Sequence, residues 1–488
     1  MNFQIPKEVS QITEELEKAG FEAFLVGGCV RDLLIGREPK DWDVTTNAKP
    51  EEIMAIFKDN FYENDFGTVG VKNEEATDER LKVVEVTPYR LEGAYTDNRH
   101  PDTVSFSQKI EDDLQRRDFT INSLAYSISR GKLVDLYDGQ KDIKDKTVST
   151  VGAPTARFSE DGLRILRAVR FSSELDFEID AETEKAMMDL GHLLVNISKE
   201  RIRDEFTKMV MSGEPMKAVL TLQKLGLLKY VVPELERAIG VEQGGIHSYD
   251  VFEHLIRSLQ HSADKKYPLE IRLAALFHDI SKPESRREGG KNKTWTFYGH
   301  EVIGARVTKK ILENLKFPTK ITDKTVKLIR WHMFFSDTAQ ITLSAVRRMI
   351  VNVGRENIWD LMDLRICDRI GTGRPKEDPY RLRKYHSMIE EALRDPISVG
   401  MLKIDGKRIM EVTGIEPGPK IGFTLHALLE EVLDDPQKNT EDYLENTAKN
   451  IINLPIEELK ALGEKGKQSK EEVEEEELKK IRSSHRVK

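Results

Sequence analysis

The sequence is poor in cysteine, with only Cys29 and Cys367 among 488 residues. Two cysteines cannot form a disulfide framework, so the class of small disulfide-stabilised secreted domains is excluded and a reducing compartment is favoured. The sequence also lacks any apolar run of the roughly 18–20 residues that a bilayer-spanning helix needs. Its N-terminus lacks the basic and then apolar pattern of a secretion signal. These absences predict a cytoplasmic protein that makes no contact with a membrane.

A basic excess is also absent, since 76 lysine and arginine residues stand against 85 aspartate and glutamate residues and the net charge is −9. Proteins that coat nucleic acid usually carry a basic excess, because neutralising phosphates supplies most of their affinity. The acidic total therefore argues against a coating protein. It is compatible with an enzyme that holds a nucleic acid through local basic stripes. The sequence carries no signal for an oligomeric state.

The spacing of apolar residues changes along the chain and predicts an α+β fold. Residues 1–150 alternate short β-type runs with helical segments, which predicts an N-terminal mixed β-sheet domain with helices. Nearly every segment of residues 159–455 has helical spacing. Segments 240–250 and 371–380 have the composition of loops. Charged residues fill the chain from Gly463 onward, which we expect to be either a solvated helix or disordered.

Residues 25–45 combine a glycine turn with a following basic residue and read LVGGCVRDLLIGREPKDWDVT. Gly27 and Gly28 follow an apolar run, and their lack of side chains would allow backbone N–H groups to approach a triphosphate. Arg31 adds a positive charge at the start of the helix that we expect next. The segment therefore predicts a place where phosphate binds.

The carboxylates Asp41 and Asp43 end the same segment. On a strand they would point to one face, and Trp42 would point to the opposite face, toward a core. Glu85, in LKVVEVTPY, is a third carboxylate on another expected strand. Carboxylate oxygens suit hard cations, and two cations can neutralise the charge that develops in nucleotidyl transfer. Each element alone is common by chance, but their order favours a metal and phosphate site.

Residues 25–50 resemble the signature of the class II tRNA nucleotidyltransferases, which are the CCA-adding enzymes and their bacterial poly(A) polymerase relatives. Four later segments resemble further motifs of this family in the same order: RLEGAYTDNRHPDTVSF at 90–106, LQRRDFTINSLAY at 114–126, LVDLYDGQKDI at 133–143 and VGAPTARFSEDGLRILRAVRFSSELDFEI at 151–179. The resemblance is close over the first 235 residues and looser beyond them. It implies template-independent addition of C and A to the 3′ end of tRNA from CTP and ATP, with release of pyrophosphate.

The resemblance assigns a role to each candidate residue of this first site. Asp41, Asp43 and Glu85 would be catalytic, with two Mg²⁺ ions held by the first two and Glu85 beside them. The implied nucleotide-binding residues are Gly27, Gly28, Arg31, Arg117, Asp118, Asn122, Glu160, Asp161, Arg164 and Arg167. Among them, Arg117 would contact the triphosphate, and Asp118 and Asn122 would bind the ribose hydroxyls.

Glu160, Asp161 and Arg164 would read the base in this resemblance. A carboxylate accepts a hydrogen bond from the amino group that cytosine and adenine share, and an arginine donates to a ring nitrogen or carbonyl. Asp97 and Arg99 would form the flexible loop that switches the pocket from C to A. The loop has His100 where the family pattern leads us to expect a second arginine, so CC-only and A-only addition stay open as alternatives.

Histidines and aspartates in the helical half predict a second metal site. His254, the pair His278 and Asp279, and Asp368 occur in the order His, His-Asp, Asp, which resembles the HD phosphohydrolase superfamily. This resemblance implies that these four residues bind a divalent transition metal or Mg²⁺, with His300 as a further candidate ligand. Ser281 stands where the family usually has glycine. We expect His332, in IRWHMFF, to be structural.

The two resemblances together predict the domain organisation of the chain. The expected parts are a nucleotidyltransferase head at 1–150, a helical nucleotide- and RNA-binding neck at 151–239, an HD-type metal domain at 240–372, a helical tRNA-binding body and tail at 373–462, and a charged terminal segment at 463–488.

Other functions are compatible with the sequence. Within the transferase class, the enzyme could be a poly(A) polymerase, although its acidic C-terminal segment argues against this. A second candidate is an HD phosphohydrolase that acts on RNA ends or nucleotides. A third is a non-catalytic RNA-binding protein with decayed sites, and the intact acids and the intact RRDFTIN motif argue against it.

Overall fold

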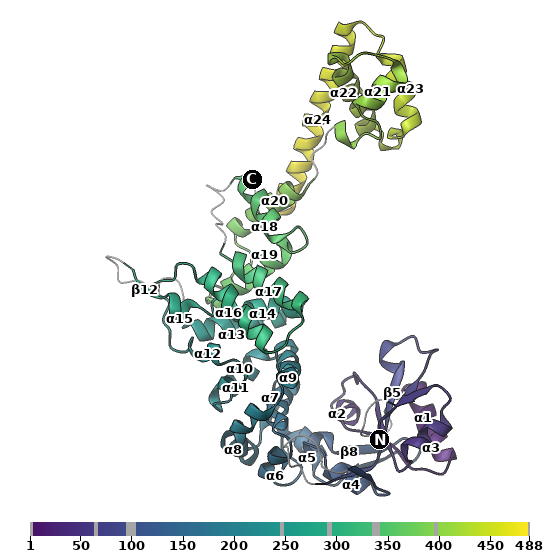
Figure 1. Ribbon diagram of the computed structural model, residues 1–488, viewed down its shortest axis with the longest axis vertical. Coiled ribbons are helices and arrows are strands. Elements are labelled where there is room, and N and C mark those ends of the chain that lie inside the picture. The colour runs from purple at the N-terminus through teal and green to yellow at the C-terminus, as the bar shows by residue number, and fades with distance from the viewer. Residues whose placement is uncertain are drawn as a thin grey trace. The chain divides into compact units, whose positions relative to one another are not determined.

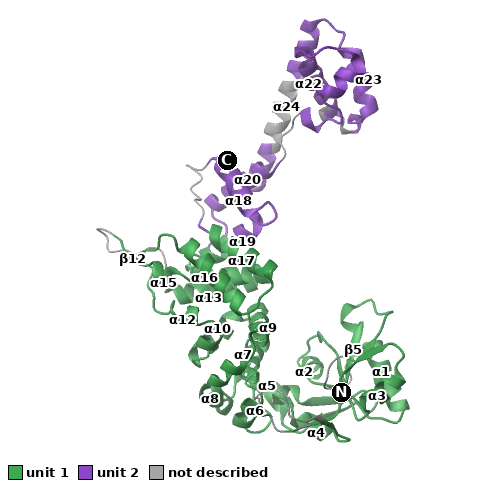
Figure 2. Cartoon of the chain, viewed as in Figure 1, with its two compact units in different colours: residues 1–332, 363–375 green, residues 333–362, 376–488 purple. Residues whose placement is uncertain are grey.

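The computed structural model describes residues 3–62, 67–93, 104–244, 248–289, 295–333, 342–394 and 399–486. The chain divides into two compact units, residues 1–332 with 363–375 and residues 333–362 with 376–488 (Figure 2). The first unit starts with a mixed sheet and continues as helices (Figure 1), which confirms the expected α+β fold class. No helix in the described ranges combines the length and hydropathy that a bilayer crossing requires. Asp97, Arg99 and His100 lie outside the described residues.

A seven-stranded sheet with the strand order β3-β4-β5-β2-β1-β8-β9 organises the N-terminal part. Its strands are β1 (Ala23–Val26), β2 (Asp43–Thr46), β3 (Asn60–Tyr62), β4 (Val69–Lys72), β5 (Val83–Pro88), β8 (Leu124–Ser127) and β9 (Lys132–Asp135). Strands β2 and β5 pair in parallel, and the other described pairs of this sheet are antiparallel. The small two-stranded sheets pair β6 (Arg90–Glu92) with β7 (Val104–Phe106), β10 (Thr147–Val148) with β11 (Glu178–Ile179), and β12 (Arg287–Glu288) with β13 (Trp295–Thr296).

Alternating side chains give the sheet two buried faces. Leu25 and Val44 pack with residues of α1 (Lys7–Lys18) in one core cluster, whereas Phe24 packs in a second cluster on the other face. This is the period of two that strands impose on their side chains. Trp42 is 5% exposed and belongs to the same cluster as Val44, so the prediction that it faces a core is confirmed. The same alternation turns Asp43 to the opposite face.

Helices make up the rest of the first unit. They are α2 (Gly28–Leu34), α3 (Pro50–Ile56), α4 (Ile110–Gln115), α5 (Gly139–Asp145), α6 (Pro154–Glu160), α7 (Leu163–Leu175), α8 (Ala181–Leu190), α9 (Lys199–Met211), α10 (Pro215–Lys224), α11 (Leu228–Val231), α12 (Pro233–Glu236), α13 (Val251–Asp264), α14 (Leu269–Phe277), α15 (Lys282–Ser285), α16 (His300–Asn314) and α17 (Thr319–Trp331). Three short 3₁₀ helices are η1 (Glu79–Leu81), η2 (Thr120–Asn122) and η3 (Gly191–Asn196).

Helix α14 is the central element of the second half of this unit. It contacts both α13 and α17, and every residue from Ile271 to Phe277 is buried. Apart from Glu270 and Arg272 the helix is apolar, and a helix that is apolar on nearly all sides is stable only inside a protein. Its C-terminal end therefore carries His278 and Asp279 directly into the interior. The C-terminal part of α19 (Ile358–Gly371) belongs to the same unit and brings Asp368.

The second unit has its own apolar core. Its helices are α18 (Leu343–Val353), α20 (Tyr380–Leu393), α21 (Gly406–Thr413), α22 (Pro419–Asp434), α23 (Glu441–Ile451) and α24 (Ile456–Ser484), with η4 (Val399–Met401) and η5 (Pro436–Lys438) between them. Residues 463–484 of the charged C-terminal segment lie within α24, so the helical alternative is the one found there. Arg482 of α24 donates to Glu391 of α20 at 2.9 Å, which attaches the end of this helix to the unit.

Candidate active sites

The three acidic residues of the first site lie along adjacent strands of the sheet. Asp43 is the first residue of β2 and stands directly opposite Glu85 of β5 in the parallel register. Asp41 precedes β2 by two residues. The three side chains line one cavity of about 280 Å³, together with Trp42, Phe61, Arg80 and Val83. The sequence therefore identified three carboxylates that the fold places around one cavity.

Asp41, Asp43 and Glu85 are the candidate metal ligands of this cavity. The donors are all carboxylate oxygens, which match the preference of hard divalent cations.

Gly27 forms the turn between β1 and α2 and has a positive φ of 79°. A Cβ atom at this position would lie 2.9 Å from Nη1 of Arg117 and 3.9 Å from Oδ2 of Asp43. Glycine is therefore required both by the backbone conformation and by the space that Arg117 occupies. The turn, the arginine expected to contact the triphosphate and a catalytic carboxylate are thus neighbours.

A chain of hydrogen bonds links the residues expected to bind the ribose. Arg31 is buried and donates from Nη1 to Oδ1 of Asn122 at 2.7 Å. Asn122 donates to Asp118 at 3.4 Å, and Arg167 of α7 donates to Asp118 at 2.6 Å. Burial opposes ionisation of Asp118, but the nearby guanidinium groups of Arg167 and Arg164 outweigh it and lower the pKa of Asp118 to about 2. Asp118 is therefore an ionised hydrogen-bond acceptor at any pH near neutrality.

The residues expected to read the base lie at the junction of α6 and α7. Arg164 contacts Glu160 at 2.5 Å and donates to the carbonyl oxygens of Arg157 and Arg116, each at 3.2 Å. Asp161 accepts from the backbone N–H of Leu163 at 3.0 Å. These contacts hold both side chains in place. Asp161 keeps lone pairs and Arg164 keeps N–H groups that can form hydrogen bonds with a base.

Arg201 of α9 is a residue of this site that the sequence reading missed. Its guanidinium binds Asp161 through two hydrogen bonds of 3.2 and 2.7 Å, a forked geometry that fixes a carboxylate in orientation as well as position. The segment from Glu200 to Phe206 carries mixed charge, a pattern typical of a solvated helix surface. Because 40 residues separate Arg201 from Asp161, no local signal could have paired them.

Replacing Arg201 with alanine is expected to relax the choice among nucleotides. Without the fork, Asp161 can rotate, so the ratio of kcat/KM for CTP over UTP should fall about tenfold, the usual range for losing one hydrogen bond to a charged group. Single-turnover incorporation of each nucleotide measures this ratio. Arg203→Ala is the matched control, because Arg203 lies on the same helix and pairs with Asp204 instead. Unchanged selectivity in Arg201→Ala would contradict the role of Asp161 in base reading.

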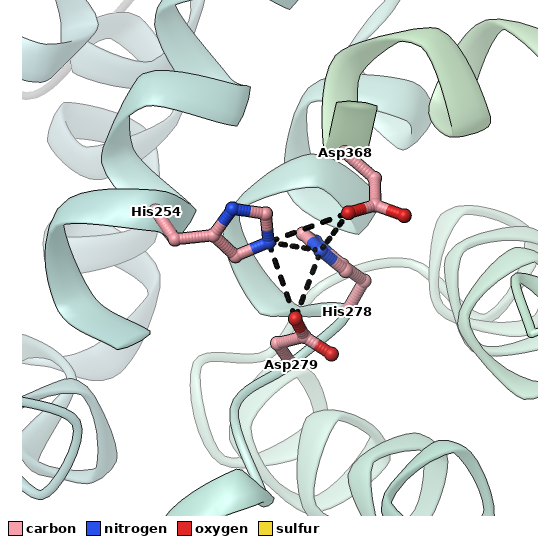
Figure 3. A group of neighbouring side chains, drawn as sticks. All are labelled: His254, His278, Asp279 and Asp368. Carbon is pink, nitrogen blue, oxygen red and sulfur yellow. Dashed lines mark hydrogen bonds and ion pairs between the residues drawn. The ribbon is translucent and has the colours of Figure 1, made fainter. Parts of the chain in front are cut away.

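The second site gathers four buried residues from three helical segments (Figure 3). Nε2 of His254 lies 2.9 Å from Nε2 of His278 and 3.1 Å from Oδ2 of Asp279. Oδ1 of Asp368 lies 3.5 Å from Nε2 of His254 and 3.7 Å from Nε2 of His278. Two imidazoles and two carboxylates that converge on one point form a donor set suited to a divalent transition metal.

A second group shares Asp279 with the first. Nε2 of His300 lies 3.1 Å and Nε2 of His332 lies 3.6 Å from Oδ1 of Asp279. His332, which we expect to be structural, is buried, and its ring belongs to this potential ligand group. Oδ1 of Asp279 and the two Nε2 atoms are buried and face one another. Two imidazole nitrogens and a carboxylate oxygen that converge in this way fit a cation.

Backbone contacts fix which nitrogen each imidazole presents. Nδ1 of His278, His300 and His332 lies 2.6–2.9 Å from the carbonyl oxygen of the residue three positions earlier. This contact places the N–H on Nδ1 and leaves Nε2 as the ligand atom. Burial opposes ionisation of Asp279, but Lys282 and His278 outweigh it and hold the pKa of Asp279 well below its usual range. Asp279 is therefore an ionised ligand.

Three family models match successive parts of the chain. The poly(A) polymerase head domain matches residues 23–149, the probable RNA and SrmB-binding site of polymerase A matches residues 176–239, and the HD domain matches residues 245–372. These matches place the chain in the class of nucleotidyltransferases with a poly(A) polymerase-type head and an HD domain.

Relatives define the family further. A CCA-adding enzyme of Ligilactobacillus salivarius is 30% identical over 447 residues, which cover 91% of this chain and 96% of that protein. An A-adding tRNA nucleotidyltransferase of Deinococcus radiodurans is 33% identical over 67% of this chain and 76% of its own length. A CCA-adding enzyme of Lactococcus lactis is 43% identical over 237 residues, and this match spans 48% of this chain and 58% of that protein. The chain belongs to the family of CCA-adding enzymes and related tRNA nucleotidyltransferases.

A solved structure agrees with this assignment. The CCA-adding enzyme of Bacillus stearothermophilus in complex with CTP is 26% identical, aligns over 91% of this chain and 98% of its own length, and has a TM-score of 0.57. Membership of this family implies dependence on a divalent metal.

Proposed function

We propose that this protein adds C and A to the 3′ end of tRNA from CTP and ATP, without a nucleic-acid template. The observation that carries the proposal is the cavity that brings Asp41, Asp43 and Glu85 together beside the turn at Gly27 and Arg117. A relative matched over 91% of the chain is a CCA-adding enzyme, and it favours this activity over poly(A) synthesis. We place the enzyme in the cytoplasm, where tRNA is matured and used.

The residues of the first site have different roles in the proposed reaction. Asp41, Asp43 and Glu85 would hold two Mg²⁺ ions, which activate the 3′-hydroxyl and neutralise the leaving pyrophosphate. Arg117, held by Asp113 at 3.0 Å, is placed to contact the triphosphate. Asp118 and Asn122 would accept from and donate to the ribose hydroxyls, which favours ribonucleotides. Asp161 and Arg164 would match the hydrogen-bonding edges of cytosine and adenine and leave a polar atom unpaired against guanine or uracil.

Nucleotide choice tests this proposal directly. A tRNA transcript that ends in CC is incubated with Mg²⁺ and one nucleoside triphosphate at a time, and product length is read on a sequencing gel. ATP should extend the transcript by one residue, while UTP and GTP should not extend it. Equal use of all four nucleotides would contradict a protein-made template at Asp161 and Arg164.

We infer a second activity at the histidine site, metal-dependent hydrolysis of a phosphate ester at an RNA end or on a nucleotide. The specific observation is the complete set of six ligands, with Asp279 shared between two groups. His254, His278, Asp279 and Asp368 would hold one divalent transition metal, and His300 and His332 would join Asp279 around a second. A bound cation there would supply an activated water and polarise the phosphate.

Metal dependence tests the second activity. Protein stripped with a chelator and reloaded with Mn²⁺, Co²⁺, Ni²⁺ or Mg²⁺ is assayed with 2′,3′-cyclic AMP and with a 3′-phosphorylated RNA. Hydrolysis restored by a transition metal supports the proposal, and its absence with every metal would reduce this site to a structural role.

We also propose the domain limits expected from the sequence, with the head at 1–150, the neck at 151–239, the HD-type part at 240–372, the body and tail at 373–462 and the terminal segment at 463–488. The change from sheet to helices after β10 supports the first of these limits, whereas residues 333–362 belong to the second compact unit and argue against a single part at 240–372.

A further inference from the structure

Four residues form one row across four adjacent strands of the sheet. Asp43 of β2 stands opposite Glu85 of β5, Glu85 opposite Gly70 of β4, and Gly70 opposite Phe61 of β3. Residues directly opposite each other in a sheet direct their side chains to the same face. The row therefore places two catalytic carboxylates, a gap at the glycine and an aromatic ring side by side on one face.

The glycine in this row allows the ring to lie over the sheet. A Cβ atom at Gly70 would lie 2.5 Å from Cζ of Phe61, so any larger residue would displace the ring. Phe61 is half-buried and lines the catalytic cavity. An aromatic ring that borders a catalytic cavity offers a face on which a nucleobase can stack.

Strand β2 lies between the cavity lined by Phe61 and the residues expected to bind the triphosphate. In the strand order, β1 and β8 lie on one side of β2, and β5, β4 and β3 lie on the other. Gly27 follows β1, and Arg117 and Asn122 precede β8. None of these three residues lines the cavity that contains Phe61. Asp43 of β2 thus lies between the residues expected to bind the triphosphate and the residues that line the cavity with Phe61.

Phosphoryl transfer requires the attacking and leaving oxygens to lie roughly in line, on opposite sides of the phosphorus atom. If pyrophosphate leaves toward Gly27 and Arg117, the attacking hydroxyl must approach from the side of β5, β4 and β3. That side is the cavity lined by Phe61. The cavity is therefore the place for the end of the RNA strand.

Arg80 is the basic residue among those that line this cavity. It lies in η1, and its Nη2 atom contacts Oδ2 of Asp78 and Oε1 of Glu38, each at 2.6 Å. The arginine is 39% exposed and the side chain of Glu38 is 75% exposed. Exposed ion pairs are weak and exchange readily with an incoming anion. A phosphate of the RNA backbone can therefore take the place of Glu38 on Arg80.

We propose that Phe61 and Arg80 form a subsite for the 3′-terminal nucleotide of the RNA, with the base against Phe61 and the last internucleotide phosphate on Arg80. This inference rests on the proposed nucleotide addition. Arginine contacts to phosphate position a strand without reading its sequence. The subsite therefore accepts an RNA whatever its last base is, as addition to transcripts that end before CCA, after C and after CC requires.

Substitutions at Arg80 and Glu38 should act in opposite directions. Arg80→Ala should raise KM for the RNA about tenfold or more and leave KM for ATP unchanged, because one charged contact is lost. Arg80→Lys should recover part of the loss. Glu38→Gln frees the arginine and should lower KM for the RNA. Arg130→Ala, an exposed arginine elsewhere on the head, is the matched control. If Arg80 only braced the loop before Asp41, both Arg80→Ala and Glu38→Gln would lower kcat instead.

A change in the RNA identifies the contact. A CC-ending RNA with a neutral methylphosphonate at its last internucleotide linkage should lose affinity for the wild type by the same factor as Arg80→Ala. It should lose nothing further with the variant, because the two changes remove one interaction. Binding is measured by fluorescence anisotropy without nucleotide, and extension is measured in parallel. Independent, additive losses would overturn the subsite. Failure of the wild type to extend any RNA would overturn the proposed function instead.

Discussion

Replacing Asp43 with asparagine is expected to lower nucleotide addition about a thousandfold or more, since the loss of one metal-binding carboxylate removes several kcal/mol of transition-state stabilisation. Asp43 is the carboxylate that stands both opposite Glu85 and beside the turn at Gly27. The same loss is expected for Asp41→Asn. Single-turnover addition of ATP to a CC-ending tRNA measures the effect.

Binding of tRNA separates catalysis from folding in this experiment. The Asp43→Asn variant should bind tRNA at least as tightly as the wild type when no cation is present, because the carboxylate that it removes repels the RNA backbone. Asp59→Asn is the matched control, since Asp59 is an exposed aspartate of the same domain outside the catalytic cavity. Full activity of Asp43→Asn would rule out the two-metal assignment.

Replacing Asp279 with asparagine is expected to abolish hydrolysis at the second site and to leave nucleotide addition intact. Oδ2 of Asp279 faces His254 and His278, and Oδ1 faces His300 and His332, so one substitution removes a ligand from both groups. Metal content, measured by mass spectrometry after dialysis, should fall with activity.

Nucleotide addition serves as the folding control for this variant. The Asp279→Asn substitution would leave the buried Lys282 without its carboxylate partner at 2.5 Å, and an unpaired buried charge destabilises a fold. Asp264→Asn, on the exposed end of α13, is the matched control. Unchanged metal content and hydrolysis in Asp279→Asn would show that the six residues do not form a metal site.

The sequence predicted the catalytic acids because their spacing is a local property. Asp41 and Asp43 are two residues apart, so on a strand their side chains point to the same face of the sheet. The same rule predicts that Trp42, between them, points to the opposite face and into the core. The row that adds Gly70 and Phe61 depends on the register of three strand pairs, and register is set by packing across the sheet. Nothing in the local sequence could place Phe61 beside Glu85.

The same reason explains what the sequence could not show in the helical half. His332 lies at the end of an amphipathic helix, and only the packing of α17 against α14 brings its ring to Asp279. Arg201 gave no signal in the sequence, because its partner Asp161 lies on another part of the chain. By contrast, His278 and Asp279 were predicted because the order His, His-Asp, Asp is a pattern of the sequence itself.

Primer extension on three tRNA transcripts, which end before CCA, after C and after CC, tests the proposed activity most directly. Each transcript is incubated with Mg²⁺ and with CTP, ATP or both, and product length is read at single-nucleotide resolution. We expect ordered addition of C, C and A, followed by arrest. Addition of A to the CC-ending transcript alone would mean a specialised A-adding enzyme. A long ladder of A, or no extension of any transcript, would contradict the proposed CCA addition.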